Sequence, residues 1–200
     1  MARLLLNEGG SKELALRYLD KVNETYQLPE WLHVRRGVCY RDAGRPQRAL
    51  QSLTWAERIA GPSVTLLEHQ ALCWYDLREW KQALRTVETA ITLQRDPELL
   101  ELRADILVEL GRYDEALQVY DKVTDGIDRV CARAYVHERM GDFNRGIHEI
   151  DEGLRNYPDA AELVACRGHL KVCQGDLDGA RWDYSLALVL EDNPVVLARR

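Results

Sequence analysis

The sequence predicts an all-α chain in which about six helix-turn-helix units follow one another as an α-solenoid. The first observation is a short phrase that recurs along the chain: a glycine or polar residue at a turn, an aromatic or apolar residue two positions later, and a small residue three positions further on. The second is the regular spacing of these small residues, whose positions differ by 34, 34, 33, 30 and 34. They are Ala15, Ala49, Ala83, Ala116, Gly146 and Ala180. With 46% apolar residues in a 200-residue chain, this spacing predicts a core shared by stacked helix pairs.

Each unit is expected to contain a helix, a tight turn and a second helix, and the recurring phrases place these units in order. The turns begin at Gly44, Arg78, Gly111, Gly141 and Gly175, and a degenerate copy of the phrase ends at Ala15. We therefore predict a single array with units at 1–29, 30–63, 64–96, 97–126, 127–160 and 161–194, followed by the start of a further helix at 195–200.

The two ends of the chain are expected to be incomplete. The first unit is partial, since its first helix is confined to Met1 to Glu8. At the other end, Asn193-Pro194 is typical of a helix start. Repeat arrays normally carry polar caps, because an uncapped unit exposes the apolar stripe that a neighbour would cover. These ends suggest a fragment of a larger protein, with end-to-end self-association through the termini as the alternative.

The repeated phrase resembles the tetratricopeptide repeat (TPR) family, and the resemblance extends over nearly the entire chain. It implies a right-handed solenoid whose first helices carry a small residue where the partner helix approaches closely, and whose second helices carry a large residue on the same face as the small one. The small residues are Gly37, Ala71, Ala104, Ala134 and Gly168, and the large ones are Leu19, Leu53, Val87, Tyr120, Ile150 and Tyr184.

Two residues depart from the family pattern. Lys171 and His137 occupy the position where the family has a large aromatic residue. From Lys171 we expect a loosely packed last unit. From His137 we expect a histidine at the edge of the core with a backbone hydrogen-bond partner.

Charge and composition exclude several classes of partner. The net charge of −6 disfavours nucleic acid, whose affinity for proteins comes from clustered Lys and Arg. No apolar run approaches the roughly 18 to 20 residues that cross a bilayer. The five cysteines are an odd number scattered among apolar segments, which favours reduced thiols. We therefore predict a cytoplasmic protein with neither nucleic acid nor a membrane as partner.

The sequence shows no catalytic constellation. It lacks a glycine-rich phosphate loop, the His-Glu-x-x-His pattern and the Gly-x-Ser-x-Gly pattern, so we predict neither enzymatic activity nor a cofactor. One spacing is typical of a metal site: Cys166, His169 and Cys173 lie on one helical face, and Cys131 on a neighbouring helix is a conceivable fourth ligand. The alternative, which the prediction of no metal follows, is that these cysteines are small buried residues.

The resemblance also implies that the first helices line a concave groove. The residues at the family's groove positions that we expect to contact a partner are Trp31, Arg41, Glu68, Tyr75, Asp76, Glu98, Glu101, Asp105, Glu109, Tyr135 and Glu138. Most are acidic, which would attract a basic segment. The alternative is a solvated acidic face that only keeps the chain soluble. The Lys, Asn and Arg clamp with which some family members hold a C-terminal carboxylate is missing.

Taken together, these patterns predict a scaffold for protein–protein interaction that binds a peptide or a partner protein, with a basic segment as the favoured ligand. The alternative is an accessory or targeting domain of a larger catalytic protein.

Overall fold

A computed structural model describes residues 12–25 and 28–191 of the chain. Within these ranges all regular structure is helical, which confirms the predicted all-α class. The helices are α2 (Lys12–Thr25), α3 (Glu30–Asp42), α4 (Pro46–Ala60), α5 (Val64–Asp76), α6 (Trp80–Leu93), α7 (Pro97–Glu109), α8 (Tyr113–Val123), α9 (Gly126–Met140), α10 (Phe143–Asn156), α11 (Ala161–Gln174) and α12 (Leu177–Glu191). The predicted helices at 1–8 and 195–200 lie outside the described residues.

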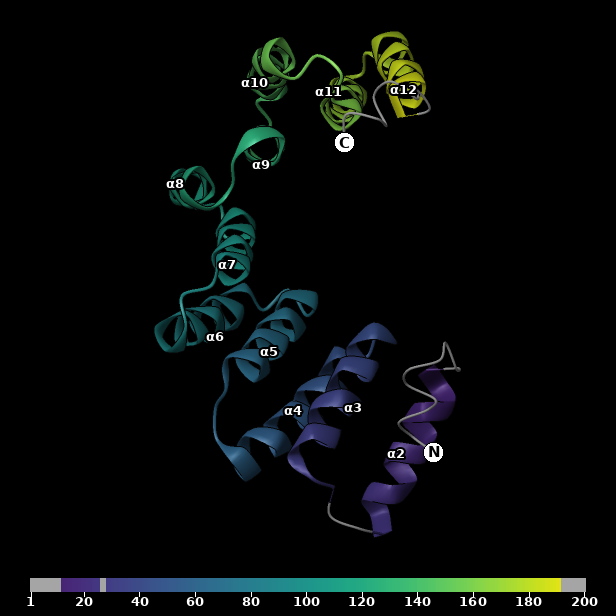
Figure 1. The fold of residues 1–200 in the computed structure, drawn as a ribbon, viewed down its shortest axis with the longest axis vertical. Coiled ribbons are helices and arrows are strands. Elements are labelled where there is room, and N and C mark those ends of the chain that lie inside the picture. The colour runs from purple at the N-terminus through teal and green to yellow at the C-terminus, as the bar shows by residue number, and fades with distance from the viewer. Residues whose placement is uncertain (1–11, 26–27, 192–200) are drawn as a thin grey trace. The chain divides into compact units, whose positions relative to one another are not determined.

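The helices belong to two compact units, Met1–Ile106 and Leu107–Arg200, whose boundary falls inside α7. In the first unit each helix from α2 to α5 packs on the next one in the chain, and α3 also contacts α5. In the second unit each helix from α8 to α11 packs on the next, and α9 also contacts α11 (Figure 1). Packing between sequence neighbours is typical of repeat arrays, and α3, α5, α9 and α11 are the first helices of their pairs.

The tight turns within the pairs share one backbone conformation. Gly44, Gly111, Gly141 and Gly175 have φ values of 68°, 73°, 77° and 88°. Arg78 occupies the same position in its pair and has a φ of 59°, a left-handed backbone conformation that residues other than glycine rarely adopt. The turn geometry therefore recurs even where the glycine does not.

The predicted small and large residues of the second helices form the cores of the pairs. Ala49, Ala83, Ala116, Gly146 and Ala180 are all buried. The large residues Leu53, Val87, Tyr120 and Ile150 are buried as well. Gly37 lies in close contact with α4, because an added Cβ would lie 2.7 Å from Cγ and 2.8 Å from Cδ2 of Leu53.

One of the predicted large core residues is not buried. Tyr184 in α12 is 39% exposed, although its position matches that of Leu53 and Ile150 in their helices. Its ring still lies against the first helix of its pair, since a Cβ added at Gly168 would lie 3.4 Å from Tyr184 Cδ1. Tyr184 therefore packs towards α11, as its place on the helix predicts, but unlike Leu53 and Ile150 it is not fully buried.

Lys171 does not mark a loosely packed last unit, contrary to the expectation from sequence. Its Nζ lies 2.8 Å from a carboxylate oxygen of Asp183, which is fully buried. Arg167 donates two further hydrogen bonds to the same carboxylate, at 2.7 and 3.0 Å. Burial raises the pKa of Asp183, but these two cations lower it more, so its pKa is below the ordinary value. The cation in the aromatic position thus neutralises a buried acid.

His137 is buried as predicted, but the predicted backbone partner is absent. Only 1% of the residue is exposed, and neither ring nitrogen has a hydrogen-bond partner among the described residues. Its Nε2 lies 3.7 Å from Glu149 Oε1. Burial, followed by the charge of Arg145, lowers the pKa of His137, which favours the neutral ring. The ring therefore packs as an uncharged core residue.

A recurring polar residue joins successive pairs and was missed in the sequence. It stands directly before the small residue of each first helix and reaches the second helix of the preceding pair. The contacts are Arg36 with Asp20 at 3.7 Å, Gln70 with Glu57 at 2.9 Å, Arg103 with Glu88 at 3.3 Å, Arg133 with Asp121 at 3.0 Å and Arg167 with Asp151 at 2.7 Å.

Three of these arginines also bind the second helix of their own pair. Arg36 donates to Ser52 Oγ at 3.0 Å, Arg133 to Glu149 at 2.8 Å and Arg167 to Asp183 at 2.7 Å. Each of them therefore ties three helices together. Bidentate Arg–carboxylate geometry makes such contacts stronger than single surface ion pairs.

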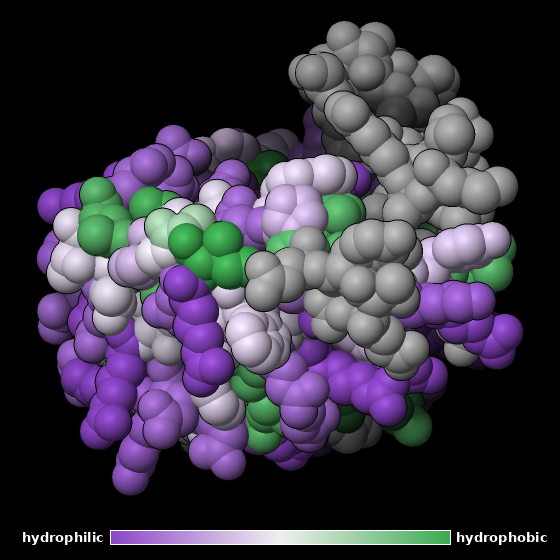
Figure 2. All heavy atoms as spheres, turned by 90° about the horizontal axis from the view of Figure 1, so that it is seen from below, coloured by the Kyte–Doolittle hydropathy of each residue, from purple (hydrophilic) through white to green (hydrophobic). Residues whose placement is uncertain are grey.

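The surface is largely polar. Figure 2 shows a face on which hydrophilic side chains predominate and hydrophobic ones form small separate patches. None of the helices described is both long enough and apolar enough to cross a bilayer.

Candidate interaction surfaces

The first unit carries a concentration of carboxylates on its first helices. We call Glu68 and Asp76 of α5 together with Glu98 of α7 the carboxylate face. Glu68 and Asp76 are eight residues apart, which is just over two turns of α5. Arg41, near the end of α3, is the cation whose charge acts on both Glu68 and Asp76. The structure therefore brings together four of the eleven residues predicted to contact a partner.

The charges on this face are not balanced. Burial raises the pKa of Glu68, and the carboxylates of Glu98 and Asp96 raise it further, whereas Arg41 lowers it by less. Burial likewise raises the pKa of Asp76 against the opposing effect of Arg41. No hydrogen bond or ion pair joins the side chain of Glu68 or Asp76 to another described residue. Glu68 and Asp76 therefore ionise less readily than isolated carboxyl groups do.

The other predicted contact residues of the first unit include two aromatic side chains, Tyr75 and Trp31. Tyr75 packs edge-on against Trp80, with ring centroids 4.9 Å apart, so part of its ring is already used within the unit. Trp31, in the first turn of α3, is 50% exposed. Glu101 and Asp105 are half-buried on α7, one turn apart.

In the second unit the predicted contact residues are paired with one another. Glu109 accepts hydrogen bonds from Arg139 at 3.0 Å and from the Tyr135 hydroxyl at 3.3 Å. Its side chain is 13% exposed. The charge of Glu109, one of the acidic residues predicted to contact a partner, is therefore neutralised by Arg139 within the unit.

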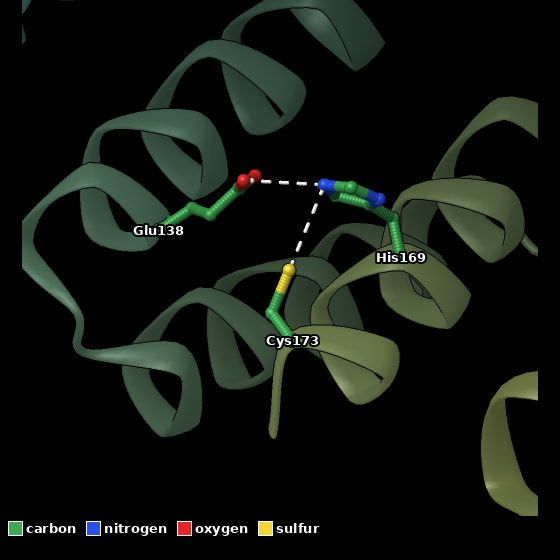
Figure 3. Close-up of side chains that lie close together, drawn as sticks. All are labelled: Glu138, His169 and Cys173. Atoms are coloured by element: carbon green, nitrogen blue, oxygen red, sulfur yellow. Dashed lines mark hydrogen bonds and ion pairs between the residues drawn. The ribbon is translucent and has the colours of Figure 1, made fainter. Parts of the chain in front are cut away.

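The predicted cysteine and histidine set is divided between two levels of the packed helices α9 and α11. At one level Cys166 Sγ lies 3.7 Å from Cys131 Sγ. At the other level His169 Nε2 lies 3.1 Å from Glu138 Oε1 and 3.8 Å from Cys173 Sγ (Figure 3). Cys166 and Cys173 are seven residues apart, which is about 10.5 Å along a helix axis. That distance explains why they have different neighbours.

The thiol pair has unequal acidities. The hydrogen bond with Cys131 and the charge of His169 together outweigh burial and lower the pKa of Cys166 to about 7. The same hydrogen bond and burial raise the pKa of Cys131. The five cysteines are all free thiols.

At the second level, Glu138 is a potential metal ligand that the sequence did not indicate. Donor atoms of Glu138, His169 and Cys173 all lie within 4.8 Å of one another. Glu138 was expected as a contact for a partner, because spacing along one helix says nothing about the neighbouring helix. The sequence did contain a signal for these neighbours, because Cys131 and Cys166 are 35 positions apart, and so are Glu138 and Cys173.

The last described helix exposes several large apolar side chains. Leu177, Trp182, Leu188 and Val189 of α12 are between 63% and 71% exposed. This is a higher exposure than that of any large apolar residue described in the first unit, where Ile59 reaches 54%.

Comparison with known proteins finds similarity to tetratricopeptide repeats, both in sequence and in structure. Residues 75–128 match the family model described as tetratricopeptide repeat. Among solved structures, a tetratricopeptide repeat protein from Parabacteroides merdae matches with 21% identity and a TM-score of 0.74, over 99% of this chain and 84% of that chain. A thermophilic TPR protein from Thermus thermophilus matches with 20% identity and a TM-score of 0.61, over 85% of this chain and 96% of that one.

A further similar structure is YrrB, described as a TPR protein with an unusual peptide-binding site. It shares 12% identity and a TM-score of 0.55, over 92% of this chain and 97% of that chain. Among curated proteins, none matches the sequence.

Proposed function

Because this chain has the tetratricopeptide repeat fold and carries the repeat's family signature in residues 75–128, we propose that it is a non-catalytic scaffold that binds a partner protein or peptide. The peptide-binding site named for YrrB supports this role. We propose that the repeats form one array and that the partner contacts the first helices of the pairs. Both roles that the sequence predicts, scaffold and accessory domain, would use the same surface.

The ligand we propose is a basic segment, and the carboxylate face carries this proposal. Burial and neighbouring carboxylates oppose the ionisation of Glu68, so its negative charge is held at a cost to the folded chain. A Lys or Arg side chain placed against Glu68, Asp76 and Glu98 would remove part of that repulsion. The favourable energy of a cationic ligand is therefore larger here than at an isolated surface carboxylate.

Removing three charges from the carboxylate face is expected to weaken binding of a basic ligand. The variant is Glu68→Gln, Asp76→Asn and Glu98→Gln, and the probe is a fluorescent amphipathic peptide rich in Lys and Arg. We expect its Kd, measured by fluorescence anisotropy, to rise at least tenfold, or about 1.4 kcal/mol. In the unchanged chain the affinity should increase as the pH rises above the ordinary carboxyl range, because the raised pKa values delay ionisation of Glu68 and Asp76.

The matched control removes three exposed carboxylates from second helices or their turns: Glu79→Gln, Asp114→Asn and Glu152→Gln. It changes the net charge by the same amount, so equal weakening in both variants would show that binding depends on overall charge alone. Unaltered binding by the first variant would refute the proposed contact, provided that circular dichroism shows the helices intact.

The exposed side chains of α12 support a second candidate, which is self-association through that helix. Trp182 and Leu188 are 71% and 63% exposed. If copies of the chain associate there, replacing Trp182 by Asp and Leu188 by Glu should shift the sedimentation coefficient towards the monomer at micromolar concentration. A chain that sediments as a monomer before substitution would rule this candidate out.

A further inference from the structure

The side chains of Glu138, His169 and Cys173 converge at the surface of the second unit. Glu138 belongs to the last turns of α9, and His169 and Cys173 lie one turn apart on α11. Their side chains point toward one another from the two helices (Figure 3). The two helices pack against each other, so the three side chains start from a fixed backbone arrangement.

Their distances are close to those of a transition-metal site. Zinc bonds of about 2.0–2.3 Å to nitrogen, oxygen and sulfur place the donor atoms of a tetrahedral site about 3.3–3.8 Å apart. Glu138 Oε1 and Cys173 Sγ already lie 3.1 and 3.8 Å from His169 Nε2. The three atoms lie within 4.8 Å of one another, so small side-chain rotations suffice to bring them around one ion. Neither helix has to move.

The type of donor narrows the choice of metal. One imidazole nitrogen, one thiolate sulfur and one carboxylate oxygen form a mixed set, which suits Zn²⁺ better than the all-oxygen preference of Mg²⁺ or Ca²⁺. Binding requires loss of the thiol proton, which the metal itself promotes. Cys173 is also exposed, whereas free cysteine is normally one of the most buried residue types. A purely structural role in the core does not explain a thiol at this place.

We propose that Glu138, His169 and Cys173 form a Zn²⁺ site that links α9 and α11. The three side chains supply three of four tetrahedral ligands, and the fourth position is open to water or to a side chain of a bound partner. The site is independent of the carboxylate face, which belongs to the first unit. It joins the first helices of two successive pairs and therefore restrains their packing when the metal is bound.

Cobalt titration of the full chain tests this site. Co²⁺ replaces Zn²⁺ in such sites and reports a thiolate ligand by a charge-transfer band in the near ultraviolet and tetrahedral geometry by intense visible bands. We expect one equivalent of Co²⁺ to produce both signals and Zn²⁺ to abolish them. Zn²⁺ is also expected to raise the thermal unfolding midpoint, because the folded chain holds the three ligands together and so binds the ion more tightly than the unfolded chain does.

Three variants should remove or weaken metal binding without removing the fold. Cys173→Ser should abolish the charge-transfer band, His169→Ala should abolish binding, and Glu138→Gln should keep the band but raise the Kd for Co²⁺ at least tenfold. His148→Ala is the matched control, since His148 is exposed on α10 and lies outside the cluster. It should bind Co²⁺ like the unchanged chain.

The neighbouring thiol pair provides the sharpest contrary result. Cys131 and Cys166 lie 3.7 Å apart on the same two helices and could bind the metal instead. If Cys166→Ser abolishes the band while Cys173→Ser leaves it, the proposed ligand set is wrong. Absence of any thiolate band in the unchanged chain, or normal binding by His169→Ala, overturns the proposal equally.

Discussion

Replacing Arg167 by Met is expected to lower the free energy of unfolding of the second unit by about 3 kcal/mol, because it leaves a buried carboxylate with one cation in place of two. Asp183 is fully buried, and Arg167 donates two hydrogen bonds to it. Denaturant titration, followed by hydrogen exchange in α11 and α12, measures the loss where it occurs. Arg155→Met, an exposed change on α10, should alter stability by no more than about 0.5 kcal/mol.

The pH dependence of this loss has a definite sign. The pKa of Asp183 is lowered in the folded chain, so its stabilising contribution is complete above the ordinary carboxyl pKa and is lost as the pH falls through the folded value. The difference between the unchanged chain and Arg167→Met should therefore shrink in acid, where a protonated Asp183 no longer needs the cation.

A double substitution separates the buried charge from lost packing. Arg167→Met combined with Asp183→Leu removes the buried carboxylate and one of its two cations, and it should regain part of the stability because the remaining cation, Lys171, is partly exposed. If the double variant is as unstable as the single one, the loss comes from packing and not from the uncompensated carboxylate.

Substitution at the close contact of α3 and α4 is expected to give a comparably large effect. Leu53→Ala should cost about 2–5 kcal/mol, because Leu53 is fully buried and its removal leaves a cavity. Gly37→Ala should cost about 1–2 kcal/mol, since the added Cβ overlaps Leu53 by more than the helix propensity of alanine repays. Equilibrium unfolding in denaturant, followed by hydrogen exchange in α3 and α4, measures both.

The double variant at these two positions tests the contact directly. The atoms that an added Cβ at position 37 meets most closely are Cγ and Cδ2 of Leu53, and Leu53→Ala removes them. Gly37→Ala should therefore cost much less in the Leu53→Ala background than in the unchanged chain. Strictly additive losses would contradict a steric origin.

The fold could be predicted from sequence because repetition multiplies a weak pattern. A small residue followed four positions later by a large one is common in helices, but its return at Leu53, Val87, Tyr120 and Ile150 is specific. The errors arose where the pattern met an unusual neighbour. Lys171 occupies an aromatic position and binds the buried Asp183 of the next helix, an acid that the pattern of its own helix does not show.

The candidate sites were less predictable, because they depend on contacts between helices. The position along α11 correctly placed His169 and Cys173 together, yet it could not show that Glu138 lies beside them while Cys166 lies beside Cys131. The recurring arginine also left a trace, one position before each small residue of the first helices. Apolar periodicity does not reveal this position, because its residue is polar.

The contact of that arginine with the preceding pair has a consequence for protein engineering. A first helix that begins a grafted segment brings a guanidinium but not the acid that receives it, since the acid stands on the second helix of the preceding pair. Two segments from different parents are therefore matched at their junction when the first helix after it carries the arginine and the second helix before it carries an aspartate or glutamate. Arg103 and Glu88, or Arg133 and Asp121, are the pairs that a chimera of this chain has to keep together.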